Sequence, residues 1–354
     1  MRPFTCALSL LFIGCGPTTR FGNPPGGPAA SDPNRDRDGD GDGYTPAQGD
    51  CNDDNRSINP GAIQVPGDAT DYACNGMAGV VSACDGALAG SRDPASLTRA
   101  FDACDPRFWK SATLLGPSDQ RARKVVSRFG VLQPRGGQAM ALLSSGIAAD
   151  KNDPDFDASV AQDPGTELGG ANSSSNPLPA LPGAAGCSQS QPAVVNDYTE
   201  LVVKLVAPTN ANSFSFDFQF FSAEYPVYVC TEFNDEFLVL QESAAQFVTP
   251  TNIAFDKQKN PVTVNNGFFT VCTNDPRKPQ TQHCTHPVSD IAGTEFGGST
   301  GWLTTTSPVS PGEAVTLHFI IFDEGDHVLD SAALIDNFRW GVSVVQTPTT
   351  TPIQ

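Results

Sequence analysis

The sequence predicts a mainly β protein, in which an antiparallel, jelly-roll-like β-sandwich follows a small, disulfide-stabilised loop module. Phe214, Phe216, Phe218 and Phe220 alternate with polar residues, which is the two-residue period of a strand with one buried face. Further apolar runs of strand length are separated by turn-rich segments, with little helical pattern between them. Only 17% of the residues are charged, and the chain has 33 glycines and 30 prolines. That composition is typical of loop-rich exported β proteins.

Residues 1–15 resemble the leader of a bacterial lipoprotein. Met1-Arg2 is a short basic start, and the stretch from Ala7 to Ile13 is apolar apart from one serine. The following FIGC, which ends at Cys15, is similar to a lipobox with phenylalanine where leucine is usual. The resemblance implies lipidation of Cys15 and an outer-membrane or cell-surface location. A plain secretory peptide is the alternative, and no other segment reaches the roughly 20 apolar residues of a membrane span.

A linker rich in proline and glycine (16–34) leads to an Asp-rich module (35–76) that reads DRDGDGDGYTPAQGDCNDDN from Asp36. Eight aspartates lie between Ser31 and Asn55, against only Arg35 and Arg37. Such a loop requires a cation to fold tightly, because its carboxylates repel one another in water. The alternative is a disordered acidic linker without metal.

The spacing within this module favours Ca²⁺, which prefers oxygen ligands at about 2.3–2.6 Å. If Asp38, Asp40 and Asp42 are ligands 1, 3 and 5 of an EF-hand-like loop, Gly43 takes the turn position and Tyr44 offers its carbonyl oxygen. Gly49 stands where an EF-hand has its last glutamate, so another acid is needed. The remaining candidate ligands are Asp36, Asp50, Asp53 and Asp54, with Asp50 preferred.

The cysteine count predicts disulfides. Of ten cysteines, Cys6 and Cys15 lie in the leader, which leaves an even number in an exported chain. Sequence alone allows many pairings, but proximity favours Cys51–Cys74, Cys84–Cys104 and Cys272–Cys284, which leaves Cys187–Cys230. A zinc site at Cys272, His283, Cys284 and His286 is the weaker alternative, because His283 and Cys284 are adjacent.

A cysteine-flanked connector (77–124) precedes the sandwich (125–342). Ser118–Phe129 is predicted to be a helix, since Ala122, Val125, Val126 and Phe129 follow helical spacing. Residues 150–191 are rich in serine, asparagine, proline and glycine, so we expect a long surface excursion. Residues 343–354 are expected to be a polar tail. The predicted strands are Leu201–Val206, Phe214–Phe220, Phe237–Gln241, Phe268–Val271, Val315–Phe322 and Ala332–Val345.

The predicted sandwich contains the stretches FFSAEYPVYVCTEFNDEFLVL (Phe220–Leu240) and IIFDEGDHVLDSAALIDNF (Ile320–Phe338). These two stretches resemble the choice-of-anchor L domain, a β-sandwich module of bacterial exported proteins. Both Asn252–Asn266 and a strand at Met140–Gly146 fit the same domain. The module in turn is similar to Asp-rich, thrombospondin-like metal-binding repeats of myxobacterial and related surface proteins. VVSACDG at Val80–Gly86 departs from the usual DNDCDG of those repeats. Neither resemblance implies an enzymatic activity or a known ligand.

A second group of oxygen donors flanks the apolar strands of the sandwich. Between Phe214 and Glu242 there is no lysine or arginine to balance these acids, so a second Ca²⁺ is a candidate. The alternative is a set of solvated loop acids. The candidate ligands are Glu224, Asn234, Asp235, Asp323, Asp326 and Asp330.

Charge and motifs limit the function. A net charge of −18 argues against nucleic-acid binding and against electrostatic adsorption to anionic membranes. Gly297–Gly301 formally matches GxSxG and precedes Asp323 and His327, but no strand–turn–helix context surrounds it. The sequence therefore predicts no catalytic residues. It favours a lipid-anchored, calcium-binding adhesion or structural module for a glycan or protein ligand, with a carbohydrate-active hydrolase or carbohydrate-binding module as the alternative.

Overall fold

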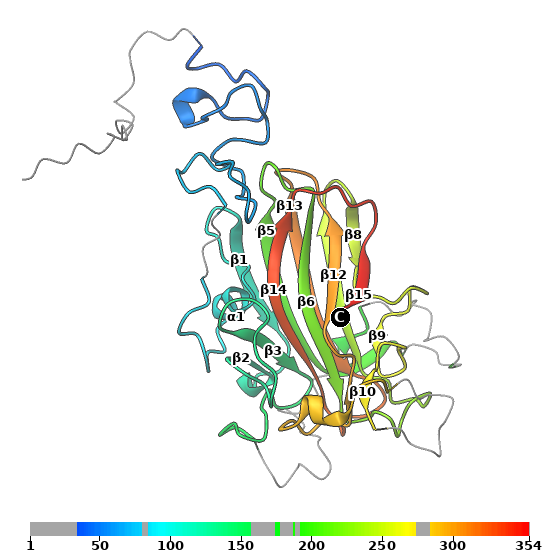
Figure 1. Cartoon of the computed structure of the whole chain (residues 1–354). Helices are drawn as coiled ribbons and strands as arrows, with labels where there is room; N and C mark the ends of the chain where they lie inside the picture. The colour runs from blue at the N-terminus through cyan, green and yellow to red at the C-terminus, as the bar shows by residue number, and fades with distance from the viewer. Residues whose placement is uncertain are drawn as a thin grey trace, which may run out of the picture.

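The computed structural model describes residues 34–79, 84–156, 174–177, 187, 192–273 and 284–353. Two antiparallel sheets face each other, and the predicted β-sandwich is confirmed (Figure 1). The first sheet runs β1 (Trp109–Leu115), β5 (Val194–Val206), β13 (Ala314–Asp323), β7 (Glu236–Ser243), β8 (Phe247–Asn252), with β4 (Ser174–Ser175) on β5 and β9 (Val262–Thr263) on β7. The second runs β10 (Val271–Cys272), β11 (Gly298–Ser299), β6 (Ser213–Ser222), β14 (Ser331–Gly341), β3 (Met140–Ser144), β2 (Arg123–Val126), with β12 (Leu303–Pro308) between β6 and β15 (Thr349–Pro352).

The phenylalanines of β6 fill the space between the sheets, as their alternation predicts. Phe216 packs edge-on against Phe319 of β13, with ring centroids 5.3 Å apart. Phe218 packs against Phe237 of β7 at 5.2 Å. These rings are fully buried, so they bring the two sheets together by removing large apolar surfaces from water.

Asp217 and Gln219, which alternate with the phenylalanines of β6, are also buried. Gln219 donates to the Ser299 hydroxyl at 2.8 Å. Asp217 accepts from Thr304 at 2.7 Å and pairs with Arg135 at 3.0 Å. The Gln219 amide nitrogen and the Asp217 carboxylate therefore have partners that offset part of their desolvation.

The predicted helix Ser118–Phe129 is wrong. A short 3-10 helix, Gln120–Ala122, is capped by Asp119 and leads directly into β2. Val125 packs in the main core, whereas Val126 packs in a smaller cluster on the outer face. Neighbouring residues that are buried on opposite faces require a strand, and pairing with β3 supplies it.

The connector (77–124) contributes to the sandwich instead of only leading to it. It contains β1 and a helix, α1 (Pro94–Ala100), whose N-terminus is capped by Asp93. Leu97 and Phe101 of this region lie in the main core. The sandwich therefore begins before residue 125.

Other predicted boundaries also change. Of Phe268–Val271 only Val271 is in a strand, and β14 ends at Gly341 instead of Val345. Part of the predicted polar tail forms β15, where the Thr350 hydroxyl bonds that of Thr305 at 2.8 Å. Most of the expected excursion at 150–191 lies outside the described residues.

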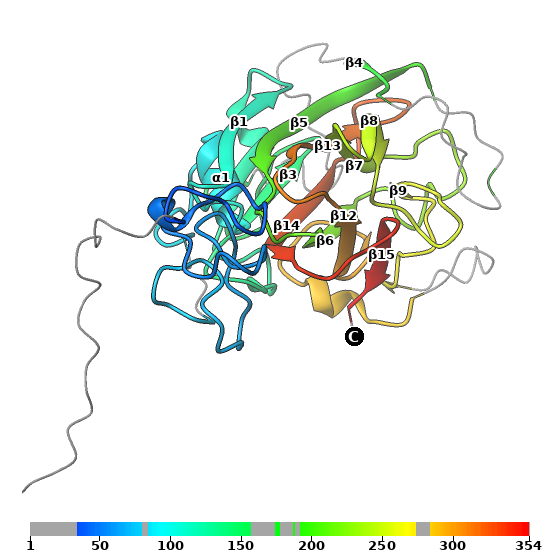
Figure 2. The same cartoon turned by 90° about the horizontal axis from the view of Figure 1, so that it is seen from above.

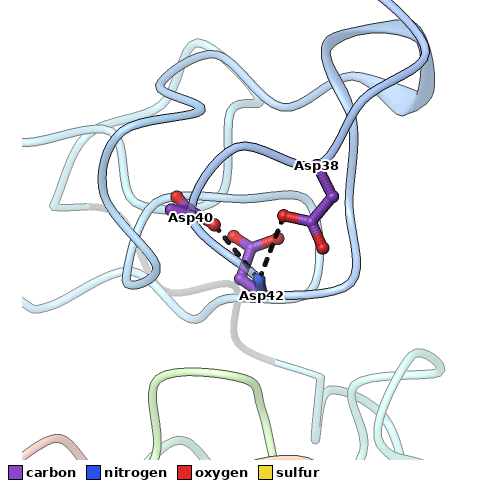
Figure 3. Close-up of side chains that lie close together, drawn as sticks. All are labelled: Asp38, Asp40 and Asp42. Atoms are coloured by element: carbon purple, nitrogen blue, oxygen red, sulfur yellow. Dashed lines mark hydrogen bonds between the residues drawn. The ribbon is translucent and has the colours of Figure 1, made fainter.

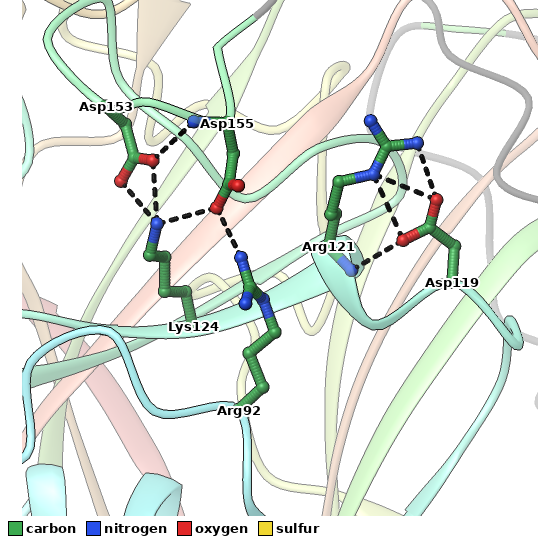
Figure 4. Close-up of polar contacts among 6 residues, drawn as sticks. All are labelled: Arg92, Asp119, Arg121, Lys124, Asp153 and Asp155. Atoms are coloured by element: carbon green, nitrogen blue, oxygen red, sulfur yellow. Dashed lines mark hydrogen bonds and ion pairs between the residues drawn. The ribbon is translucent and has the colours of Figure 1, made fainter.

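Ion pairs fasten β2 to the loops around it (Figure 4). Lys124 is nearly buried and contacts the carboxylates of Asp153 and Asp155, each at 2.7 Å. Arg92 also pairs with Asp155, and Arg121 pairs with its neighbour Asp119 at 2.6 Å. These contacts are local supports of the fold, since all three cations have carboxylate partners nearby.

Strand β8 forms an outer edge of the first sheet. Its side chains are mostly exposed, and Val248 is 76% exposed. Pro250 lies within it, close to a break in register with β7. The other outer strand on this side, β15, also ends in a proline, Pro352.

Candidate metal-binding sites

The Asp-rich module folds as loops at one end of the sandwich, with a single short helix at Pro46–Gln48 (Figures 1 and 2). Asp38, Asp40 and Asp42 point toward one another in Figure 3, and one oxygen of each lies within 4.8 Å of the others. Among the described residues, no other set of three acidic, histidine or cysteine side chains meets so closely. The predicted 1-3-5 spacing therefore does bring these carboxylates together.

Backbone amides hold this loop in shape. Asp38 accepts from the N–H groups of Gly41 at 2.7 Å and Gly43 at 2.9 Å. Both glycines have positive φ, at 77° and 95°, which explains why glycine alternates with aspartate here. The Gly43 hydrogen bond lowers the pKa of Asp38, so that carboxylate is held in its charged form.

Three carboxylate oxygens in the module lack a donor. One Oδ2 each of Asp40, Asp42 and Asp50 is buried and accepts no hydrogen bond from the described residues. Burial raises the pKa of all three groups, and their neighbouring negative charges raise it further. A hard cation bound among Asp38, Asp40 and Asp42 would satisfy the oxygens of Asp40 and Asp42, and Asp50 lies near enough for its charge to act on both groups.

The remaining predicted ligands differ in how buried they are and in how close they lie to Asp38, Asp40 and Asp42. Asp50, the preferred substitute for the last EF-hand ligand, is buried and joins the group electrostatically. Asp53 is near enough for its charge to raise the pKa of Asp40, and it also accepts from the Gly39 N–H at 2.8 Å. Asp36 and Asp54, by contrast, are exposed to solvent. Tyr44 donates its N–H to Asp42 at 2.8 Å.

A link from the module to the sandwich is not visible in the sequence. Asn59 is fully buried and its side chain contacts Asp42, which lowers the pKa of that carboxyl against the effect of burial. The same side chain accepts from the Thr209 hydroxyl at 2.7 Å. Asn210 accepts from the Ile63 N–H at 2.9 Å and donates to the Ile63 carbonyl at 3.1 Å. The loop between β5 and β6 thus holds the module by side-chain hydrogen bonds.

A cavity of about 380 Å³ lies at this junction. Arg56, whose guanidinium also donates to the Gly41 carbonyl at 3.0 Å, faces it together with Asp42. Asn210, Asn212 and Thr209 line it from the sandwich. Its walls are rich in hydrogen-bonding groups, so it suits a polar ligand.

Most of the second predicted group is also brought together, although more loosely. Glu224, Asn234, Asp235, Asp323 and Asp330 are all buried at one end of the sandwich. Asp326 is only half-buried, and its carboxylate accepts from the Val328 N–H at 3.1 Å. Glu324 was missed by sequence reasoning, although it directly follows Asp323 and is 3% exposed.

Burial dominates the electrostatics of this second group. It raises the pKa of Glu224 to about 10, of Glu324 to about 8 and of Asp235 to about 7. It also raises the pKa of Asp323 well above its usual value, with a further contribution from the charge of Asp235. The group cannot carry all its charges at neutral pH without a compensating cation.

The cysteines pair as proximity in sequence suggests: Cys51–Cys74, Cys84–Cys104, Cys187–Cys230 and Cys272–Cys284. The zinc alternative is contradicted, because Cys272 and Cys284 are bonded to each other, while His283 lies outside the described residues. Cys15 and the rest of the predicted leader lie outside them too.

The GxSxG match does not form a nucleophile elbow. Ser299 is buried in β11 and accepts from Gln219 at 2.8 Å. His327 bonds instead to Asp197, with Nδ1 2.9 Å from the carboxylate. The serine and histidine therefore serve separate pairs.

No helix in the described part of the chain has the length and apolarity needed to cross a membrane. Neither the curated proteins nor the solved structures give a significant match. A family model of the choice-of-anchor L domain does match, over residues 142–338, which is more than half of the chain. The match runs from β3 to β14, so it includes the second acidic group and excludes the Asp-rich module. The chain belongs to the choice-of-anchor L domain family, and this membership points to an exported, surface-associated protein.

Proposed function

We propose that this protein is a lipid-anchored, non-catalytic surface module that binds a glycan or protein ligand and is stabilised by Ca²⁺ in its Asp-rich loop. The observation that carries the proposal is the set of unpartnered, buried oxygens of Asp40, Asp42 and Asp50, beside the charged Asp38. Four aspartates in one small loop supply only oxygen ligands, which suits calcium better than zinc or copper.

Calcium binding orders the loop because it neutralises charges that otherwise repel. Extracellular calcium sites have dissociation constants of about 0.1–1 mM, so millimolar calcium is the appropriate range. Calcium at 100 times its dissociation constant would stabilise the folded module by about 2.7 kcal/mol.

The test is calorimetric titration of the oxidised full chain with calcium. The double variant Asp38→Ala with Asp42→Ala should lose the heat that belongs to the module. A matched control, Asp36→Ala with Asp54→Ala, removes the same charge from exposed positions and should retain that heat. Equal heats for the two double variants would refute calcium binding by the loop.

Anchoring through Cys15 is the second part of the proposal, supported by the FIGC resemblance and by the surface-associated family. Cys15→Ser should move the protein from the membrane fraction to the soluble fraction, because acyl chains on Cys15 provide the stable attachment. Retention of the variant in membranes, with no labelled palmitate in the wild type, would contradict a lipid anchor.

Carbohydrate binding is the favoured form of the alternative function. The cavity at the junction of module and sandwich offers Arg56, Asn210 and Asn212, which are side chains able to bond sugar hydroxyls. A glycan array probed with the wild type and with Asn212→Ala would test this, since loss of signal in the variant would place a glycan in the cavity.

A further inference from the structure

The second acidic group lies at one end of the sandwich, where strands of both sheets begin or end. All of these strand ends are within the family match. Glu224 follows β6, Asp235 precedes β7, and Asp323 ends β13. Within the first sheet Phe322 is opposite Glu236, and within the second sheet Ser331 is opposite Ser222. The Ser331 hydroxyl then links the two sheets by donating to Asp235. Acids from both sheets therefore converge on one buried region.

Donors are scarce in this region. The Ser331 hydroxyl donates to Asp235 at 2.6 Å, and the Glu324 N–H donates to its other oxygen at 3.3 Å. Glu224 accepts from the Asp235 N–H at 3.4 Å. None of the ion pairs among the described residues joins Glu224, Asp235, Asp323 or Glu324 to a lysine or arginine.

Asp323 is the carboxylate in this group that most clearly lacks hydrogen-bond donors. It is 1% exposed, and neither of its carboxylate oxygens accepts a hydrogen bond that meets normal geometry from the described residues. Ser145 lies close enough to lower the pKa of Asp323, but its hydroxyl is 3.3 Å from the Ser331 carbonyl, to which it donates. Oε1 of the buried Glu324 is likewise without a donor.

We infer that this end of the sandwich is a second site for a hard divalent cation of the calcium class, with Asp235 and Asp323 as its central ligands. Glu224 and Glu324 complete an all-oxygen set, and no cysteine or histidine belongs to it. Asp235 and Asp323 lie close enough in space to interact with each other. The longer side chains of Glu224 and Glu324 have the rotatable bonds to approach an ion held between these two aspartates. The inference is independent of the Asp-rich module.

The experiment uses the oxidised full chain carrying Asp38→Ala and Asp42→Ala, so that the module does not contribute. Bound calcium is measured by equilibrium dialysis at up to about 10 mM, above the range of weak extracellular sites. We expect one Ca²⁺ per chain and a calcium-dependent rise in melting temperature. Adding Asp323→Asn should abolish both the bound ion and the rise.

Thermal melting without calcium distinguishes two ways of neutralising the buried carboxylates, a bound cation or bound protons. Asp323→Asn removes a buried carboxyl group whose oxygens lack donors among the described residues, so in chelator it should melt at or above the temperature of the background chain. Asp256→Asn is the control, because that buried carboxylate accepts from Gln258 and Asn260. It should lower melting in both conditions and retain the calcium shift.

Absence of bound calcium in the background chain would overturn the inference and leave shared protons as the explanation. Retention of the ion after Asp323→Asn would overturn it as well. If Asp323→Asn fails to fold, Glu324→Gln in the same background decides by the same two measurements. A failure here would leave the calcium titration of the Asp-rich loop unaffected.

Discussion

Substitution of Asn210 by alanine should loosen the Asp-rich module from the sandwich without unfolding the sandwich. The Asn210 side chain both accepts from and donates to the backbone of Ile63, at 2.9 Å and 3.1 Å. It is 6% exposed, so water does not readily replace these bonds. Thr209 and Arg107 provide the other polar contacts between the two parts.

The magnitude follows from the number of bonds lost. Each hydrogen bond contributes about 0.5–1.5 kcal/mol net, so the pair accounts for roughly 1–3 kcal/mol of docking free energy. That loss would raise the undocked population by roughly 5- to 150-fold. The stability of the strands should change little, because local opening involves only the contacts that are broken.

Hydrogen exchange at the Thr209 amide measures this directly. That N–H donates to the Gly61 carbonyl at 3.1 Å, so it is protected only while the module is docked. Asn210→Ala should speed its exchange by the same factor, whereas amides in the β5–β13 ladder should exchange as before. Asn212→Ala is the matched control, since its side chain bonds to Val342 within the sandwich. Unchanged exchange at Thr209, or equal acceleration throughout β5, would refute the reasoning.

Two further predictions concern the sandwich. Phe218→Ala should lower the free energy of unfolding by about 3–5 kcal/mol in denaturant titration, because it leaves a cavity beside Phe237; a loss below about 1 kcal/mol would contradict tight packing there. Burial raises the pKa of Asp336 to about 7, against the hydrogen bonds from Arg135, Gly136 and Asn337. The folded state then binds this proton more tightly than the unfolded state, so stability should fall as pH rises from about 4 to about 7. Asp336→Asn should flatten that part of the profile, and an unchanged slope would contradict it.

Local patterns in the sequence predict part of this fold well. The alternation of Phe214 to Phe220 identifies β6, because a two-residue period is a direct property of a strand. The residues Ala122, Val125, Val126 and Phe129 mislead, because their spacing fits a helix although tertiary packing covers both faces of the segment. β15 has a polar sequence, TTTP, and pairing with β12 determines its structure.

In the candidate sites too, contacts between residues close in sequence could be predicted, whereas contacts set by tertiary packing could not. Asp38, Asp40 and Asp42 are close in sequence, so their convergence follows from local chain geometry. Asp235 and Asp323 meet only because β7 begins where β13 ends, at the same side of the sandwich. The contact of Asn59 with Thr209 joins residues 150 positions apart, and no local pattern contains it.

The prolines in the outer strands affect whether copies of the chain can pair with one another through their sheet edges. Pro250 in β8 and Pro352 in β15 lack the N–H that a further strand would need for pairing. An approaching chain therefore meets an interrupted row of donors on this flank and cannot extend the sheets continuously. Copies of the chain that meet along this flank are thereby disfavoured from polymerising edge to edge into fibres.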